Sequence, residues 1–434
     1  MGMEEFDIII AGGGMVGVTT ALALAKIKDN QPLLKIALVE SIEVDSNASP
    51  SFDARAVALS AASVAIYKSL DLWSELKPLA ESILDIHISE QGHFGFTRLS
   101  TKERKSNKLS KMSGEINALG QVIPLDETGP VLWNAVKSFK NITTFCPNKI
   151  IKIDSLKEQA KNHKITVFLE SANNKVQKST TKRLTAKLLI AADGTFSHLA
   201  KMAEIKTERT SYSQHAIIAN ISTEKPHNNK AFERFTKEGP LALLPLTRNR
   251  MSLVWCQNEA HCKKTMKLDD KTFKSELQKS FGFRLGKINR VGERTSYPLS
   301  LHLPEKIYSG RILLLGNSAH TLHPIAGQGF NVGLRDIAAL IDSVNAEFTA
   351  DPVFDLGSEV FLEKYYQQRK PDWNKTIGAT NSLVRLFSND FFPLNSVRSK
   401  ALWLVDKIPL IKAKIANVAM GFDGESAKLT RRIK

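Results

Sequence analysis

The chain has 434 residues and carries 60 Lys and Arg against 44 Asp and Glu, a formal net charge of +16. With 42% hydrophobic and 24% charged residues, its composition is that of a globular protein, which excludes a disordered or fibrous chain, and its length suggests about two to four domains. The three cysteines fit no CxxC pattern, so we expect neither a disulfide scaffold nor a structural zinc site. The basic balance leaves phosphates, nucleic acid and an anionic membrane open as partners.

An uncharged run of nearly transmembrane length occupies residues 8–25 near the N-terminus. Acidic residues precede this run, where a signal peptide carries basic ones, and three consecutive glycines interrupt it. The pattern instead predicts a buried strand over Phe6–Ala11, a glycine turn, and a helix of small residues from about Met15. We therefore expect a soluble or peripheral protein with neither a signal peptide nor a membrane span.

The glycine turn has the pattern Gly-x-Gly-x-x-Gly at Gly12, Gly14 and Gly17. In a dinucleotide-binding turn, the first glycine permits the tight turn, the second lets the backbone approach a pyrophosphate, and the third lets helix and strand pack closely. A second apolar strand over residues 35–40 ends in Glu40, which can accept hydrogen bonds from a ribose diol. The glycine pattern alone is weak, but with this second strand and its terminal acid it predicts an ADP-containing dinucleotide.

Two later segments add to this pattern. Residues 187–194 form an apolar strand closed by Asp193-Gly194, and residues 311–336 form a strand, a glycine-rich loop and a helix from about Asn331. Together with the glycine turn, they resemble the class A flavoprotein aromatic hydroxylases, and within that family the ubiquinone-biosynthesis branch. The resemblance runs from about residue 6 to about residue 389. Other similar stretches are FDARAVAL (52–59), ALGQVIPL (118–125), AFERFTKEGPLALLPL (231–246), FGFRLGKI (281–288) and TLHPIAGQGFNVG (321–333).

The resemblance implies FAD as the bound cofactor and NAD(P)H as a transient reductant without a Rossmann domain of its own. The expected cofactor-binding residues lie in the three motifs and in two of the similar stretches. They are Gly12, Gly14, Met15, Val16, Gly17, Glu40, Arg55, Gln121, Asp193, Gly316, Asn317, Pro324, Gly327, Gln328, Gly329, Phe330 and Asn331.

The loop over residues 324–331 carries the most chemical interest. Its glycines let the backbone come within contact distance of a flat ring, and the following helix N-terminus would stabilise negative charge on a reduced flavin. Two positions depart from the family pattern: Asn317 replaces an aspartate, and Ala200 replaces an arginine. An amide at Asn317 can still accept a hydrogen bond through its oxygen.

The implied reaction is hydroxylation of the aromatic ring of 2-polyprenyl-6-methoxyphenol in ubiquinone biosynthesis, with NAD(P)H and O2, through a C4a-hydroperoxyflavin. Three alternatives stay open: hydroxylation at a neighbouring ring carbon, a prenyl reductase of the same superfamily, and a flavin-bearing scaffold of the ubiquinone-biosynthesis assembly. No catalytic base can be named from the sequence.

The remaining strands predict a second layer. Short strands at about ten-residue spacing between residues 212 and 256 indicate an antiparallel sheet, to which residues 85–100 add strands. We expect an α/β fold in which a discontinuous, Rossmann-like FAD-binding domain (1–80, 110–205 and 290–345) is interleaved with a mixed or antiparallel-sheet substrate domain (81–109 and 206–289). A C-terminal helical region with a basic tail covers 346–434. The active site should lie between the second sheet and the flavin.

Two segments of the chain are strongly basic. Residues 101–114 predict a flexible basic loop, and residues 396–434 hold nine Lys and Arg against three Asp and Glu. Their amphipathic pattern fits either a membrane-surface helix or a helix that packs on the core with a solvated basic face. We expect a cytoplasmic protein, with a lipid-tailed phenol and O2 as substrates. The inner, anionic face of a membrane and other ubiquinone-biosynthesis proteins are candidate partners, and no nucleic acid is expected.

The HxxH pair of His320 and His323 lies on a loop without a nearby acid, so a metal site is not expected, while a proton-relay role stays open. Cys256 and Cys262 are expected to be buried as small hydrophobic residues rather than to act as nucleophiles.

Overall fold

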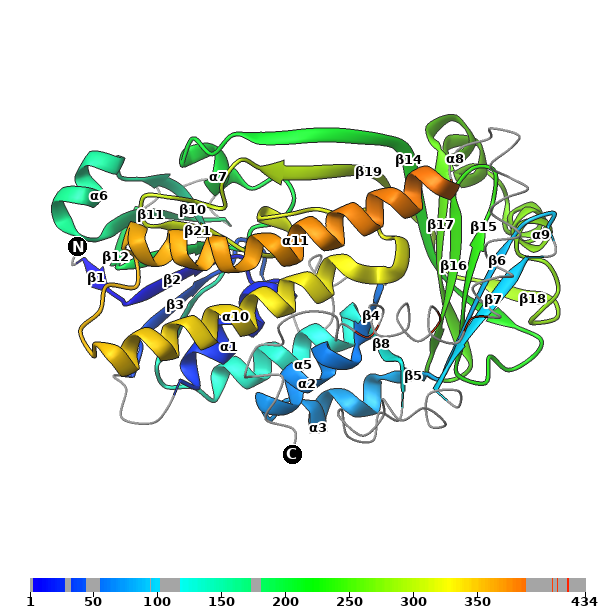
Figure 1. The fold of residues 1–434 in the computed structure, drawn as a ribbon, viewed down its shortest axis with the longest axis horizontal. Coiled ribbons are helices and arrows are strands. Elements are labelled where there is room, and N and C mark those ends of the chain that lie inside the picture. Colours follow the sequence, from blue (N-terminus) through cyan, green and yellow to red (C-terminus); the bar gives the residue numbers. More distant parts are fainter. Residues whose placement is uncertain are drawn as a thin grey trace.

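The computed structural model describes residues 3–27, 33–43, 55–93, 95–101, 118–172 and 181–387, together with residues 408, 412 and 420. Within this part of the chain the strands form four sheets. Figure 1 shows a mainly parallel sheet at one end of the molecule and a large sheet at the other, with long helices along one side. The expected α/β fold is confirmed.

A six-stranded sheet forms the first layer, and all its pairings are parallel except one antiparallel pair at the edge. Its central strands are short and wholly apolar because both faces of a parallel sheet are covered. The strand order is β20 (Tyr308–Ser309), β21 (Ile312–Leu314), β13 (Leu188–Ala191), β2 (Ile8–Ala11), β3 (Ile36–Val39) and β9 (Ile142–Phe145).

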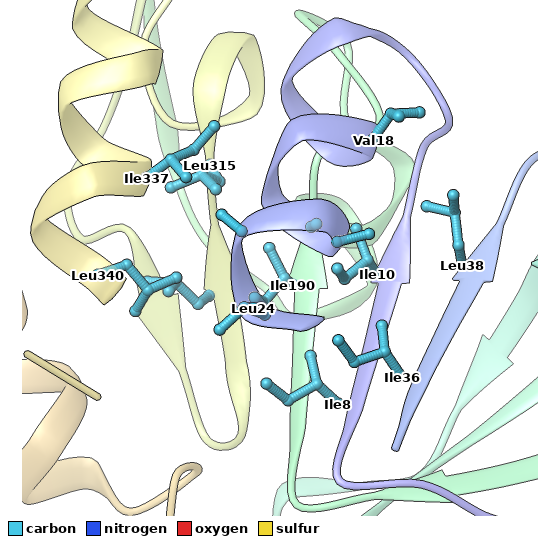
Figure 2. Packing of buried hydrophobic residues seen from close by; sticks show 14 of the residues in the cluster. Ile8, Ile10, Val18, Leu24, Ile36, Leu38, Ile190, Leu315, Ile337 and Leu340 are labelled. Carbon is cyan, nitrogen blue, oxygen red and sulfur yellow. The ribbon is translucent and has the colours of Figure 1, made fainter. Parts of the chain in front are cut away.

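Helix α1 (Met15–Ala25) covers this sheet and packs against α5 (Leu125–Lys137) and α10 (Gln328–Ala350). Figure 2 shows Val18 and Leu24 of α1 lying over Ile8, Ile10 and Ile36 of the strands. Almost every residue of α1 is buried, which explains why the segment carries no polar face. The apolar N-terminal run is therefore a buried strand and helix, as the sequence predicts.

Two smaller sheets flank this layer. One has the order β1 (Glu4–Glu5), β12 (Lys182–Ala186), β11 (Ile165–Ser171) and β10 (Asn148–Ile153), with α6 (Leu156–Asn162) between β10 and β11. The other has the order β4 (Ala56–Ser60), β8 (Gly120–Pro124) and β5 (Glu81–Ile83), with α2 (Ala61–Ser69) and α3 (Trp73–Leu76) following β4.

An eight-stranded sheet forms the other end of the molecule. Its order is β18 (Ile288–Val291), β14 (Thr207–Thr223), β17 (Arg250–Asn258), β16 (Pro240–Leu246), β15 (Lys230–Phe235), β6 (Asp85–Glu90) and β7 (Phe96–Ser100), and β19 (Thr295–Pro304) also pairs with β14. All pairs are antiparallel except β15 with β6. Helices α8 (Glu259–Met266) and α9 (Asp270–Phe281) pack on its outer face, where Phe273 and Phe281 join the strand residues Phe232 and Trp255 in one apolar cluster.

The expected antiparallel strands are confirmed, although β14 begins at Thr207, earlier than the predicted strand region. Strand β19 lies in a segment that we assign to the FAD-binding domain but pairs with β14 of the eight-stranded sheet. The division into domains stays a proposal. Helix α11 (Glu359–Phe387) packs on α10 and begins the expected C-terminal helical region.

Helix α10 begins at Gln328, not near Asn331 as predicted. A 3-10 turn over Ile325–Gly327 leads into it, and Gly327 takes a left-handed conformation with φ of 59°. The Asn331 side chain donates to the Gly327 carbonyl, one turn back, so it closes the first helical turn rather than preceding it.

None of the described helices combines the length and the apolar character needed to cross a membrane. Apart from single residues, the basic segments at 102–114 and 396–434 lie outside the described residues.

Candidate functional site

The glycine turn between β2 and α1 shows three different reasons for glycine. Gly12 has φ of 107°, and a Cβ there would lie 2.3 Å from the Ala192 carbonyl oxygen. A Cβ on Gly17 would lie 1.9 Å from the Gly12 carbonyl oxygen, so helix and strand could not pack as they do. A Cβ on Gly14 would meet nothing within 4 Å and would project into open space. The predicted tight turn and close helix–strand packing are therefore confirmed.

Glu40 and Trp133 form hydrogen bonds to the backbone of this turn. The Gly13 N–H donates to Glu40 Oε2 at 2.5 Å, and the Trp133 indole N–H donates to the Gly13 carbonyl at 2.9 Å. The other Glu40 oxygen, Oε1, accepts from the Ile42 N–H at 2.8 Å. Glu40 thus orders the turn as well as facing the cavity described below. The role of Trp133 was not predicted, because no sequence spacing connects α5 with the turn.

Asp193 is also a structural residue. Its Oδ2 accepts hydrogen bonds from the His198 and Leu199 N–H groups at 2.8 and 3.2 Å, at the start of α7 (His198–Met202). Its Oδ1 accepts from the Ser318 hydroxyl at 3.0 Å, and Ser318 in turn accepts from the Gly194 N–H. Ser318 therefore joins the ends of β13 and β21, which brings two of the predicted motifs together.

Asn331 anchors the glycine-rich loop to the end of β4. Its Oδ1 accepts from the Ser60 N–H and the Ser63 hydroxyl, at 2.8 and 2.7 Å. Its Nδ2 donates to the Ala58 and Gly327 carbonyls, at 2.9 and 2.8 Å. Groups of the protein itself fill the hydrogen-bonding capacity of this amide. The Asn331 side chain therefore positions the N-terminus of α10.

One cavity of about 1250 Å³ connects these features. It extends from the glycine turn and the first turn of α10 to the inner face of the eight-stranded sheet. Thirteen of the predicted residues line it: Gly12, Gly14, Met15, Val16, Glu40, Arg55, Asp193, Asn317, Pro324, Gly327, Gly329, Phe330 and Asn331.

Four predicted residues are not among those that line the cavity, namely Gly17, Gln121, Gly316 and Gln328. Gly17 and Gly316 act through packing, since a Cβ on Gly316 would lie 2.9 Å from a methyl of Val16. Gln121 accepts a hydrogen bond from the Ser82 hydroxyl at 3.2 Å, within the three-stranded sheet. Its place beside a cofactor stays a proposal that this geometry does not support.

Arg55 lies in the cavity wall with its guanidinium 5.2 Å from the centre of the Tyr297 ring of β19. A cation over an aromatic face is held in place by the ring's negative face. This contact links the segment before β4 to the eight-stranded sheet, and Tyr297 was not predicted.

His323 lines the cavity as a neutral imidazole. Its Nδ1 accepts from the Ile325 N–H at 3.2 Å, so its Nε2–H can donate to the Gln214 side-chain oxygen at 3.1 Å. Burial lowers the pKa of His323 to about 4. The imidazole therefore stays uncharged at neutral pH and holds the loop against β14.

The expectation that no acid lies near His320 was wrong. Its Nε2 lies 2.7 Å from Asp336 Oδ2, because α10 packs against the segment just before His320 and so places Asp336 beside it. Asp336 is fully buried, and its Oδ1 accepts from Arg369 and Trp373 of α11, at 2.7 and 2.8 Å. His320 thus belongs to a network that joins the loop to two helices. Within the described residues, no cluster of three or more His, Cys, Asp or Glu is suited to a metal ion.

Sequence reasoning also missed Glu233 of β15, which lines the cavity on the sheet side. Ala231 and Phe235, two residues before and after it, share its face of the strand and also line the cavity. A charged residue at an inward position of an alternating strand is the signal that could have found it. The expected burial of Cys256 and Cys262 is confirmed, and burial raises the pKa of both thiols.

The residues present fit a flavin dinucleotide. The open space at Gly14 is where an elongated phosphate group could approach the backbone, and a Cβ would occupy it. The 23-residue helix α10 places its N-terminus at the same cavity, where its dipole favours negative charge. Glu40 lies at the end of β3, the position from which an acid contacts a ribose.

Comparisons with known proteins agree with this geometry. A family model described as an FAD binding domain matches residues 5–377. Ubiquinone hydroxylase UbiL of Rhodospirillum rubrum is 28% identical over 96% of this chain and 89% of its own length. The 3-demethoxyubiquinol 3-hydroxylase of Escherichia coli is 28% identical over 96% of this chain and 99% of its own. Among solved structures, p-nitrophenol 4-monooxygenase PnpA from Pseudomonas putida superimposes with a TM-score of 0.76 at 17% identity, covering 98% of this chain and 100% of that one.

Proposed function

Because this chain belongs to the FAD-binding domain family and is an FAD-dependent aromatic hydroxylase, we propose that it hydroxylates the ring of a 2-polyprenyl-6-methoxyphenol in ubiquinone biosynthesis. The observation that carries this proposal is the cavity of about 1250 Å³ that reaches from the glycine turn to the eight-stranded sheet. It is larger than the roughly 300–1,000 Å³ of most ligand pockets, so it has room for a flavin and an aromatic substrate together.

The two ends of the cavity have different chemistry. Backbone groups of the glycine turn and of the first turn of α10 line one end, together with Glu40 and Asp193. The other end is a sheet face made mostly of Ile, Leu, Val and Ala side chains. A dinucleotide matches the first end, and an apolar ring with a prenyl tail matches the second.

Bound FAD, once reduced by NAD(P)H, supplies the oxygen chemistry that protein side chains lack. The protein's own residues bind, orient and exclude water. The α10 N-terminus, fixed by Asn331, would stabilise negative charge on the reduced ring, and the Gly14 backbone would hold the pyrophosphate. The apolar sheet face excludes water from the reacting ring.

A specific observation favours a second candidate. One relative, 28% identical over nearly its whole length, is named for hydroxylation at position 3 of demethoxyubiquinol. Hydroxylation at a neighbouring ring carbon is therefore the alternative substrate assignment. In either case we propose a cytoplasmic protein that takes its lipid-tailed substrate from a membrane surface.

The test uses purified holoprotein with a short-chain 2-prenyl-6-methoxyphenol and, separately, a short-chain demethoxyubiquinol. We expect the phenol to stimulate NAD(P)H oxidation and to gain the mass of one oxygen atom. Oxygen transfer to the demethoxyubiquinol alone would move the assignment to the neighbouring position. Tight FAD binding without oxygenation of either compound would contradict the proposal and favour a scaffold role.

A further inference from the structure

Glu233 is exceptional among its neighbours in the cavity wall. In the β-sheet register it lies opposite Ala242 of β16 on one side and Ile88 of β6 on the other. Within the described strands of the eight-stranded sheet, Glu233 is the one acidic residue that lines the cavity. An apolar wall therefore carries a single carboxyl group.

One oxygen of this carboxyl group lacks the protein contact that usually accompanies burial. Its Oε1 has essentially no solvent-accessible area and no hydrogen-bond partner within the described residues. The next residue, Arg234, donates through Nε to the Ser280 carbonyl, so its guanidinium group is engaged with α9. Glu233 as a whole is half-buried and lines the cavity, so a hydrogen-bond donor on a ligand could compensate the partly desolvated carboxylate there.

The titratable surroundings of Glu233 are simple. Its cross-strand neighbours, Ala242 and Ile88, carry no charge, and the group that senses its charge is the Cys256 thiol of β17. Burial raises the pKa of that thiol, so it stays protonated. Burial also raises the pKa of Glu233 itself to about 7.

Building on the proposed function, we propose that Glu233 binds the phenolic hydroxyl of the aromatic substrate: its carboxylate accepts the O–H hydrogen bond and fixes the rotation of the ring. The contact is a hydrogen bond to an ionised acceptor, which is about twice as strong as one between neutral groups. It also selects among substrates, because the same carboxylate repels an aromatic acid. Neutral phenols are accepted and benzoates are rejected.

The test measures the affinity of the FAD-loaded protein for a short-chain 2-prenyl-6-methoxyphenol and for its O-methyl ether, by isothermal titration between pH 5.5 and 8.5. The phenol should bind more tightly as the pH rises through about 7, where Glu233 loses its proton. The ether cannot donate, so its affinity should not change with pH. At pH 8 the wild type should prefer the phenol by about tenfold or more, as expected for a hydrogen bond to a charged group.

Glu233→Gln keeps the size of the side chain but removes the charge and the titration. The variant should bind the ether as the wild type does, lose about tenfold in phenol affinity at pH 8, and show no pH dependence. Glu90→Gln is the matched control, because Glu90 is a buried acid on β6 that does not line the cavity. It should behave as the wild type in every titration.

The outcomes separate this inference from the proposed function. If the wild type oxygenates the phenol but Glu233→Gln retains its phenol affinity and pH profile, Glu233 does not bind the hydroxyl and the inference is wrong. If the wild type oxygenates no phenol yet still prefers phenol over ether through Glu233, the proposed reaction fails while the binding site stands.

Discussion

Gly14 and Gly17 lie three residues apart in one turn, yet their surroundings are opposite. A Cβ at Gly14 enters open cavity space, whereas a Cβ at Gly17 would overlap the backbone of Gly12. The motif predicts a ligand-facing role for Gly14 and a packing role for Gly17, and the packed structure provides surroundings that fit both roles.

This difference leads to a paired prediction. Gly14→Ala should fold with nearly unchanged stability but bind FAD at least about tenfold more weakly, because the methyl group occupies the space needed by a phosphate. Gly17→Ala should lose about 3 kcal/mol of unfolding free energy or more, because backbone must move to admit the methyl. Thermal unfolding of the apoprotein and fluorescence titration with FAD measure the two effects. Equal losses of stability in both variants would contradict the distinction.

At the scale of elements, α10 and α11 are joined by buried charges. Asp336 of α10 accepts from Arg369 and Trp373 of α11 and lies beside His320 of the preceding loop. Burial would raise the pKa of Asp336, but the Arg369 and His320 contacts outweigh it and hold the pKa below its usual value. The network positions the start of α10 and thus one wall of the cavity.

Asp336→Asn should therefore destabilise the protein. The substitution leaves Arg369 buried with less compensation, and breaking a buried ion pair costs about 3–5 kcal/mol. Urea unfolding at neutral pH measures the loss. Asp351→Asn, an exposed position after the end of α10, is the control and should change stability by less than about 0.5 kcal/mol. A similar result for both variants would show that the network adds little.

At the scale of the whole molecule, the cavity lies between the mainly parallel six-stranded sheet and the eight-stranded sheet. Figure 1 shows that the strands of the eight-stranded sheet come from distant parts of the chain. The residues proposed to bind the cofactor are backbone groups, Arg55 and even acidic residues, so they would use little of the net charge of +16. We propose that the excess instead serves approach to an anionic membrane that holds the lipid-tailed substrate.

Vesicle sedimentation tests this use of the charge. The full chain should bind vesicles containing phosphatidylglycerol, and binding should weaken as salt rises from about 50 to 500 mM, because ions screen exposed charges. Neutral phosphatidylcholine vesicles are the control and should bind weakly at every salt concentration. If vesicle binding depended on neither lipid charge nor salt concentration, the membrane role would be contradicted and the excess of basic residues would be assigned to solubility.

The sequence alone determined the local features of this protein: the strand–turn–helix at the N-terminus, the strand ends at Glu40 and Asp193, and the antiparallel strands of the second sheet. These are predictable because turn geometry and apolar periodicity act over a few residues. The start of α10 was predicted three residues too late, because the Asn331 amide donates a hydrogen bond back to the Gly327 carbonyl. The spacing of residues in a sequence does not reveal such hydrogen-bond partners.

Only the tertiary structure decided which distant residues meet. It placed Asp336 beside His320, Trp133 against the glycine turn, Tyr297 under Arg55, and Glu233 in the wall of the same cavity as Gly14. The physical reason is that burial and pairing depend on how sheets and helices pack across the whole chain. A carboxyl group such as that of Glu233 acquires its raised pKa, and its proposed role, only when that packing partly removes it from water.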